Sequence, residues 1–308
     1  MSQSLLRSLD VTCGRDSGGY CDGDLTMFNS RPELRIRMPE LPEVETTRRG
    51  IEPAVRGQVI RSILVREPRL RWRVPRELPE EAAGQRLREL RRRAKYLLFD
   101  LERGTMILHL GMSGSLRLMP CSIAPALHDH VDIVLDSGLC VRFNDPRRFG
   151  SLLWTTEDPL QHPLLRSLAP EPLSKEFNGA YLARAAAGRS VAIKQLIMNG
   201  QIVVGVGNIY ASEALFRAGI NPRRSAKRIK RGEFDALVKS IKAVLRSAIR
   251  AGGTTLRDYV NAEGAPGYFR QKLYVYERTR DPCRVCKTPI KHFVQGQRST
   301  YFCPKCQR

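Results

Sequence analysis

Four cysteines near the C-terminus constrain this chain more than any other feature. Cys283 and Cys286 form one C-x2-C pair, and Cys303 and Cys306 form a second pair after sixteen intervening residues. Two such pairs can place four thiolates at the corners of a tetrahedron, the arrangement that Zn²⁺ takes in structural sites. Because no ligand position stays open, the spacing predicts one structural Zn²⁺ in a small β zinc finger over residues 273–308.

The charge of the chain points to a polyanionic partner. Lys and Arg total 52 against 31 Asp and Glu, which gives a net charge of +21. Such a field favours nucleic acid, although a solvated basic surface, a ribosomal protein or a membrane-surface protein has the same balance. The sequence has no run of 18 apolar residues and no apolar leader. We therefore expect no membrane-spanning segment, and we expect the protein to be located in a reducing cytoplasm.

Residues 1–37 differ from the rest of the chain. They hold five arginines and five acidic residues, so the whole net charge belongs to residues 38–308. They are rich in Ser, Gly and Asp and show no clear periodicity, which is typical of disorder. We interpret them as a disordered extension, or as translated sequence upstream of a true start at Met38.

Residues 38–158 carry strand signals after one helix that contains Pro42 in its first turn. Two hairpins are expected, one from Tyr96–Leu101 with Met106–Leu110 and one from Val131–Leu135 with Leu139–Phe143. Several such strands in one stretch predict an antiparallel β-sandwich with flanking helices.

The pattern becomes helical after a proline-rich hinge at residues 159–173. Asn208 is expected to cap a helix that ends at Gly219, and Phe234–Ile249 has the apolar spacing of a long amphipathic helix. The chain is therefore predicted to be an α+β multidomain protein: a sandwich over 38–158, a helical domain over 174–272, and the zinc finger.

The segment Met38-Pro39-Glu40-Leu41-Pro42-Glu43-Val44-Glu45 resembles the N-terminus of the formamidopyrimidine-DNA glycosylase family almost word for word. In that family the initiator Met is removed and the proline amine is the nucleophile. The resemblance therefore implies that Pro39 attacks the sugar C1′, and that Glu40 donates a proton to the deoxyribose or the departing base.

A terminal amine suits this role because a nucleophile must be unprotonated. An α-amino group titrates near 8 and a lysine near 10.4, so the terminal amine is free roughly several hundredfold more often at neutral pH. Here the sequence departs from the family, since translation from Met1 gives Pro39 an amide nitrogen. A start at Met38, cleavage of the extension, or loss of this chemistry would each account for the departure.

Further motifs carry the same resemblance and imply a DNA-binding surface. Arg91–Leu98 resembles the family's hairpin lysine motif, with Lys95 as a proton shuttle in the site. Val203–Glu213 resembles its helix-two-turns-helix motif. The remaining residues that the resemblance assigns to DNA are Met112, Arg147 and Phe149, which fill the gap left by a flipped base, and His128, Lys194, Asn208 and Arg298, which contact the DNA.

The match implies a bifunctional glycosylase and AP lyase of base excision repair, with Arg298 also assisting δ-elimination. Its partner would be double-stranded DNA that contains oxidised bases, and the protein would be a monomer in the bacterial cytoplasm, associated with the nucleoid. The segment Gly252–Phe269 resembles the family's loop over 8-oxoguanine and favours oxidised purines. An endonuclease VIII-like enzyme for oxidised pyrimidines, and a non-catalytic damaged-DNA-binding protein that retains residues 1–37, are the alternatives.

Overall fold

The first helix begins where the sequence supplies a capping pair of glutamates. The computed structural model describes residues 39–252 and 273–308, and α1 spans Leu41–Val55. The Glu40 backbone N–H donates to Glu43 Oε2 at 3.0 Å, and Pro42 lies in the first turn. Glu43 thus satisfies the N–H of the N-cap residue, and Pro42 has no N–H that would need a partner in the first turn. The predicted helix is confirmed.

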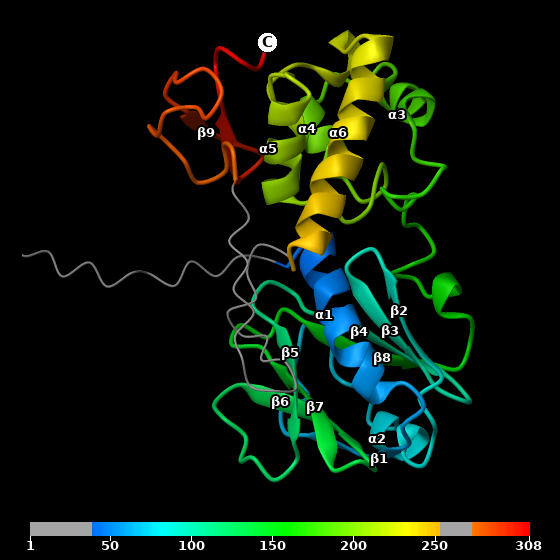
Figure 1. Ribbon diagram of the computed structural model, residues 1–308. Helices are drawn as coiled ribbons and strands as arrows, with labels where there is room; N and C mark the ends of the chain where they lie inside the picture. The colour runs from blue at the N-terminus through cyan, green and yellow to red at the C-terminus, as the bar shows by residue number, and fades with distance from the viewer. Residues whose placement is uncertain (1–38, 253–272) are drawn as a thin grey trace, which may run out of the picture. The chain divides into compact units, whose positions relative to one another are not determined.

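Two four-stranded antiparallel sheets follow (Figure 1). Their strand orders are β1-β6-β7-β5 and β2-β3-β4-β8. The strands are β1 (Ile60–Val65), β2 (Glu89–Arg93), β3 (Tyr96–Asp100), β4 (Thr105–His109), β5 (Ser115–Pro120), β6 (Asp129–Leu135), β7 (Leu139–Asn144) and β8 (Ser151–Thr155). Apolar side chains of both sheets share one buried cluster, which includes Ile63, Phe99 and Phe143. The predicted antiparallel sandwich is confirmed.

Both predicted hairpins are present in these sheets. In the first, β3 pairs with β4 and Tyr96 lies opposite His109. In the second, β6 pairs with β7 and Val131 lies opposite Phe143. A short helix that the periodicity did not reveal, α2 (Leu78–Ala82), precedes β2.

The second half of the chain is helical until the zinc finger. Its elements are η1 (Pro159–Gln161), α3 (Gly179–Ala186), α4 (Ile193–Ile197), α5 (Asn208–Arg217), η2 (Ala226–Arg228) and α6 (Arg231–Arg250). Helices α3 and α5 pack against α6, whose predicted apolar face is buried (Figure 1). Gly219 follows α5 with a φ of +72°, as the predicted C′ position requires. The predicted loop over the lesion, Gly252–Phe269, lies outside the described residues except for Gly252.

The zinc finger contains one two-stranded hairpin, formed by β9 (Lys291–Gln295) and β10 (Arg298–Phe302). The residues between the two cysteine pairs supply both strands, so the predicted small β zinc finger is confirmed. Their backbones pair in register from Arg298 opposite Gln295 to Phe302 opposite Lys291. Each strand has only five residues, too few for the alternation to stand out from the many charged side chains around it.

The end of the chain is bonded to the turn that follows α5. Arg308 N–H donates to Gly219 O at 3.0 Å, and Asn221 N–H donates to Arg308 O at 3.0 Å. The side chain of Gln307 donates to Ile220 O at 3.0 Å. The finger is therefore joined to the helical domain through its last residues. Over the described stretches, no helix has the length and apolar character needed to cross a bilayer.

Candidate active site and zinc centre

Glu40 is held by the N-terminus of a helix far along the chain. Its carboxylate accepts hydrogen bonds from Gly207 N at 2.9 Å, Ile209 N at 2.9 Å and Tyr210 N at 3.3 Å. These N–H groups belong to the first turn of α5 and its N-cap, where a helix favours an anion. Only 2% of Glu40 is exposed. The arrangement fixes Glu40 beside Pro39 and leaves it almost no contact with bulk water.

Burial changes the acidity of Glu40. It raises the pKa of this carboxyl from an ordinary 4.5 to about 7, although Lys95 and the backbone N–H groups of Ile209 and Tyr210 act to lower it. A carboxyl with a pKa near neutrality is populated in both its protonated and its ionised form. Glu40 is thereby suited to give and take a proton.

Lys95 lies in the turn that joins β2 to β3. Burial lowers the pKa of its ammonium group, as does the charge of Arg298, while Glu40 acts to raise it. The carboxyl and the amine therefore titrate closer together than the same groups would in water, which eases proton transfer between them or through a bound substrate.

A cavity of about 420 Å³ brings most of the expected residues together. From the sequence-based set, its walls include Glu40, Lys95, Met112, Arg147, Lys194, Asn208 and Arg298. The structure places Pro39 next to Glu40 in the chain and half-buried, but not in the cavity wall. The sandwich, the helical domain and the finger each contribute side chains, so the cavity depends on all three.

Lys194 and Asn208 are bonded to each other and to the finger. Lys194 Nζ donates to Asn208 Oδ1 at 2.6 Å, Thr300 Oγ1 at 2.8 Å and Ser299 O at 3.1 Å. Burial lowers the pKa of Lys194 to about 7, and Glu40 opposes this change. A nearly buried ammonium group with three uncharged acceptors ties the hairpin β9–β10 to α4 and α5.

The expectation that Asn208 caps α5 was wrong. Gly207 is the N-cap and Asn208 is the first residue of the helix. The Asn208 side chain donates to Ser299 O at 3.0 Å in addition to accepting from Lys194. The capping acceptor comes instead from Glu40, a residue 167 positions earlier than Gly207, which a local sequence pattern cannot reveal.

Two loops of the sandwich are held together by Asp145. Its carboxylate accepts from Ser113 Oγ at 2.5 Å and from Gly150 N at 2.7 Å, and Arg147 N–H donates to Ser113 Oγ at 3.2 Å. Asp145 is fully buried. These bonds set the spacing between the loop with Met112 and the loop that follows β7.

The expected wedge residues lie on these loops. The Phe149 side chain is 45% exposed, and the Arg147 guanidinium lies 5.5 Å from the centre of its ring. A large apolar side chain that is exposed to water is typical of a surface that becomes buried when a partner binds. Met112 is half-buried in the cavity wall, whereas His128 is half-buried outside it, with a φ of +71°.

The four cysteines form one cluster. All four Sγ atoms lie within 4.8 Å of one another, with Cys283–Cys306 at 3.9 Å and Cys286–Cys303 at 3.4 Å. A tetrahedral zinc site with Zn–S bonds of about 2.3 Å has S–S edges of about 3.8 Å, so the donors fit. Residues 280–308 also match the family model "Zinc finger found in FPG and IleRS". The cluster is a site for one structural zinc ion.

Sequence reasoning missed several residues of the cavity. Tyr276, Gln195 and Met198 line its wall. Tyr276 lies against the Tyr301 ring with centroids 5.0 Å apart, and its hydroxyl is 3.5 Å from Asn208 Nδ2. In the sequence, only the aromatic residues that precede Cys283 could have indicated that Tyr276 lines the cavity.

Glu213 was also missed as a contact between domains. Its carboxylate accepts from Tyr274 N at 2.8 Å, Val275 N at 2.9 Å and Tyr276 N at 3.0 Å. Only 5% of Glu213 is exposed. This helix residue therefore fixes the segment that leads into the finger.

Comparison with known families decides where the chain belongs. The family models of the "Formamidopyrimidine-DNA glycosylase N-terminal domain" and the "Formamidopyrimidine-DNA glycosylase H2TH domain" match residues 38–152 and 168–260. This chain is a member of the formamidopyrimidine-DNA glycosylase family. The formamidopyrimidine-DNA glycosylases of Methylococcus capsulatus and Thioalkalivibrio sulfidiphilus are each 58% identical to it over 271 residues, which is 88% of this chain and all of each relative.

Solved structures of formamidopyrimidine-DNA glycosylases have the same fold. The MutM (Fpg) protein of Thermus thermophilus is 39% identical, with a TM-score of 0.77 over 87% of this chain and 98% of its own. A mutant of the Lactococcus lactis Fpg, in complex with DNA containing Fapy-dG, is 31% identical, with a TM-score of 0.81 over 88% of this chain and all of its own.

Proposed function

We propose that this chain is a bifunctional DNA glycosylase and AP lyase of base excision repair, acting on oxidised purines such as 8-oxoguanine and formamidopyrimidines. The observation that carries the proposal is the buried Glu40, held by the N-terminus of α5 and placed beside Lys95 and Pro39 at a cationic cavity. Family membership and the relatives that bind Fapy-dG DNA support the substrate class.

The reaction begins at the Pro39 nitrogen in a chain that starts at this residue. The free secondary amine attacks C1′ of the flipped nucleotide, the bond from C1′ to the base breaks, and the base leaves with that electron pair. Glu40 supplies a proton to the deoxyribose or the departing base, which its raised pKa permits. The attacking nitrogen then loses its proton, and the C1′–O4′ bond breaks with its electron pair going to O4′, which is protonated. The nitrogen and C1′ are thereby left as an iminium.

Strand cleavage follows from that iminium. The cation acidifies the C2′ proton. Lys95, which lines the cavity and also shuttles protons during excision, accepts it. Loss of this proton expels the 3′ phosphate by β-elimination, and δ-elimination expels the 5′ phosphate, with Arg298 as the phosphate contact. The four clustered cysteines would hold a zinc ion, which would stabilise the fold of the hairpin that carries Arg298 and would supply no group to these steps.

The remaining residues form the proposed DNA interface. In this proposal Met112, Arg147 and Phe149 fill the gap left by the flipped nucleotide. The exposure of the Phe149 side chain supports this role. His128, Lys194 and Asn208 contact the DNA backbone. We further expect a monomer in the bacterial cytoplasm, associated with the nucleoid where its substrate lies, with domain boundaries near residues 158 and 173.

Borohydride trapping on duplex DNA tests the mechanism. The chain beginning at Pro39 is compared with the chain beginning at Met1, on 8-oxoguanine and on thymine glycol duplexes. The first form should crosslink to the 8-oxoguanine strand and nick it, and the second should bind without crosslinking. Crosslinking by the Met1 form, with its extension verified by intact mass, would overturn the role of Pro39, and a preference for thymine glycol would favour the endonuclease VIII-like alternative.

A further inference from the structure

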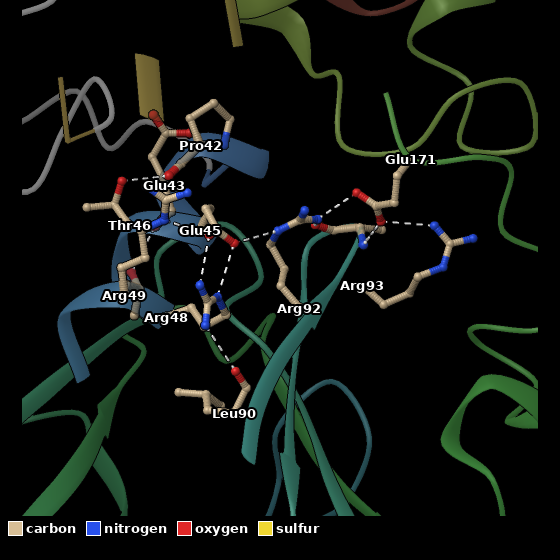
Figure 2. A network of polar contacts seen from close by, with 12 residues as sticks. Pro42, Glu43, Glu45, Thr46, Arg48, Arg49, Leu90, Arg92, Arg93 and Glu171 are labelled. Atoms are coloured by element: carbon tan, nitrogen blue, oxygen red, sulfur yellow. Dashed lines mark hydrogen bonds and ion pairs between the residues drawn. The ribbon is translucent and has the colours of Figure 1, made fainter. Parts of the chain in front are cut away.

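Glu171 reaches from the segment between the sandwich and the helices back to the turn that carries Lys95. Its Oε1 accepts a hydrogen bond from Ala94 N at 2.7 Å. The same oxygen accepts from the Arg93 guanidinium at 2.9 Å, and Oε2 accepts from the Arg92 guanidinium at 2.8 Å (Figure 2). One carboxylate thus binds two consecutive arginines and the next backbone N–H. Glu171 has no role in the chemistry described above.

The turn itself has an unfavourable backbone conformation. Arg93 and Tyr96 form the last pair of strands β2 and β3, so Ala94 and Lys95 alone make the turn. Ala94 has a φ of +55°, an unfavourable conformation that a residue with a Cβ rarely adopts. The surrounding contacts must therefore maintain this conformation.

Both peptide groups of Ala94 are held. Its N–H donates to Glu171, and its carbonyl accepts from the Arg92 guanidinium at 2.9 Å. Because Lys95 follows directly, the orientation of these two peptide groups sets the direction in which its side chain leaves the turn. The carboxylate of Glu171 is the acceptor that orients both the N–H and the arginine.

The same segment also contacts the loop before α5. The Arg93 guanidinium donates to Leu168 O and Ala169 O, both at 2.7 Å, and Ala169 N donates to Gly200 O at 3.1 Å. Ala94, Ala169 and Val204 pack in one buried cluster. The backbone N–H groups that bond the Glu40 carboxylate begin at Gly207. Residues 168–171 therefore lie between the Lys95 turn and the segment that holds Glu40.

The network continues to α1 on the other side. Arg92 Nε donates to Glu45 Oε2 at 3.0 Å, and Glu45 also accepts from Arg48 and Arg49 (Figure 2). Burial alone would raise the pKa of Glu45, but the hydrogen bonds from Arg48 and Arg49 lower it to about 2. Arg92 is thus held between the carboxylates of Glu45 and Glu171. Removal of either carboxylate would leave a half-buried guanidinium short of a partner.

We infer that Glu171 is a positioning residue, which holds the β2–β3 turn so that Lys95 faces Glu40 in the cavity. The inference rests on the proposed function, in which Lys95 moves protons. If Glu171 acts through Lys95, its removal should slow excision only while Lys95 is present. A residue that merely stabilises the fold would slow excision by the same factor with or without Lys95.

A double-mutant cycle in the chain beginning at Pro39 separates these cases. The wild type, Glu171→Gln, Lys95→Ala and the double variant are compared by single-turnover excision of 8-oxoguanine with excess enzyme. Glutamine keeps the shape of Glu171 but removes its charge. Glu233→Gln is the matched control, because Glu233 accepts two hydrogen bonds from the Arg224 guanidinium away from the Lys95 turn. Thermal unfolding and zinc content confirm that each variant is folded.

We expect Glu171→Gln to lower the rate of excision, and we expect this decrease to require Lys95. Glu171→Gln should slow excision by about 10- to 100-fold, the scale of a misplaced catalytic group, with affinity for abasic-site DNA changed by less than about threefold. In the Lys95→Ala background the same change should cost less than about twofold, because coupled residues are not additive. Glu233→Gln should excise at the wild-type rate.

Two outcomes would overturn the inference. One is a wild-type rate for Glu171→Gln, and the other is an equal loss in both backgrounds. A wild type that neither excises 8-oxoguanine nor crosslinks to the DNA would instead contradict the proposed function, so the two failures are distinguishable.

Discussion

The raised pKa of Glu40 predicts how folding stability depends on pH. Glu40→Gln removes the titrating group and keeps its size. The comparison uses the chain beginning at Met1, where the nitrogen of Pro39 is an amide and adds no charge beside Glu40. The quantity of interest is the difference in unfolding free energy between wild type and variant, followed from about pH 5 to pH 9, a range that spans the folded-state pKa.

The magnitude follows from the pKa of Glu40 in the two states. Burial raises this pKa from an ordinary 4.5 to about 7, so between these values the folded protein binds more protons than the unfolded chain. The stability that protonated Glu40 confers is therefore full below about pH 4.5 and is lost as the pH rises through about 7. The whole change is about 3 kcal/mol, most of which falls between about pH 5 and pH 7.

Urea unfolding of both proteins at each pH measures this difference. Titrating groups that do not interact with Glu40, including the zinc thiolates, are common to the two proteins and cancel to first order. Lys95 and Lys194, whose pKa values Glu40 raises, contribute to the difference together with Glu40. A difference that stays constant within about 0.5 kcal/mol would show that burial does not dominate at Glu40. A difference of opposite sign would show that the N–H groups of α5 and the charge of Lys95 outweigh burial.

Three further variants test the finger and the cavity. Cys283→Ser removes a zinc ligand and should lower both zinc content and duplex affinity, the latter by about tenfold or more in fluorescence anisotropy. Arg298→Ala removes one phosphate contact and should reduce the slope of log affinity against log salt by about one. Gly207→Ala places a Cβ against the Glu40 carboxylate and should lower the unfolding free energy by about 1–3 kcal/mol and slow excision.

Matched controls accompany these variants. Cys121→Ser changes a half-buried cysteine outside the cluster and should leave zinc content unchanged. Gly200→Ala adds a Cβ that meets no atom within 4 Å among the described residues and should be nearly neutral. Full zinc content in Cys283→Ser, an unchanged salt slope in Arg298→Ala, or wild-type stability in Gly207→Ala would each contradict the structural reasoning.

The sequence predicted the elements whose signals are local. The helix with Pro42, both hairpins and the amphipathic face of α6 each depend on periodicity or turn residues within a short window, and each is confirmed. The cysteine cluster was predicted for the same reason, since a C-x2-C pair is local and its duplication is specific.

Contacts between distant segments were the part that sequence could not supply. Glu40 caps α5 in place of Asn208, and Glu171 binds the Lys95 turn at Ala94 from 77 positions away. Nothing in the residues near Glu171 marks it as the partner of two arginines. Family resemblance named Lys194 as a DNA contact, but only the structure shows its ammonium group bonded to the finger.

The contacts of Glu213 bear on how the protein could be divided. The carboxylate of Glu213 accepts hydrogen bonds from three successive backbone N–H groups, those of residues 274–276. The finger is therefore attached to α5 by non-covalent contacts as well as by the continuous chain. Two separately produced polypeptides, one ending and one beginning between residues 252 and 273, should on this basis reassemble into a split enzyme. Its activity would then vary with the concentration of the smaller fragment.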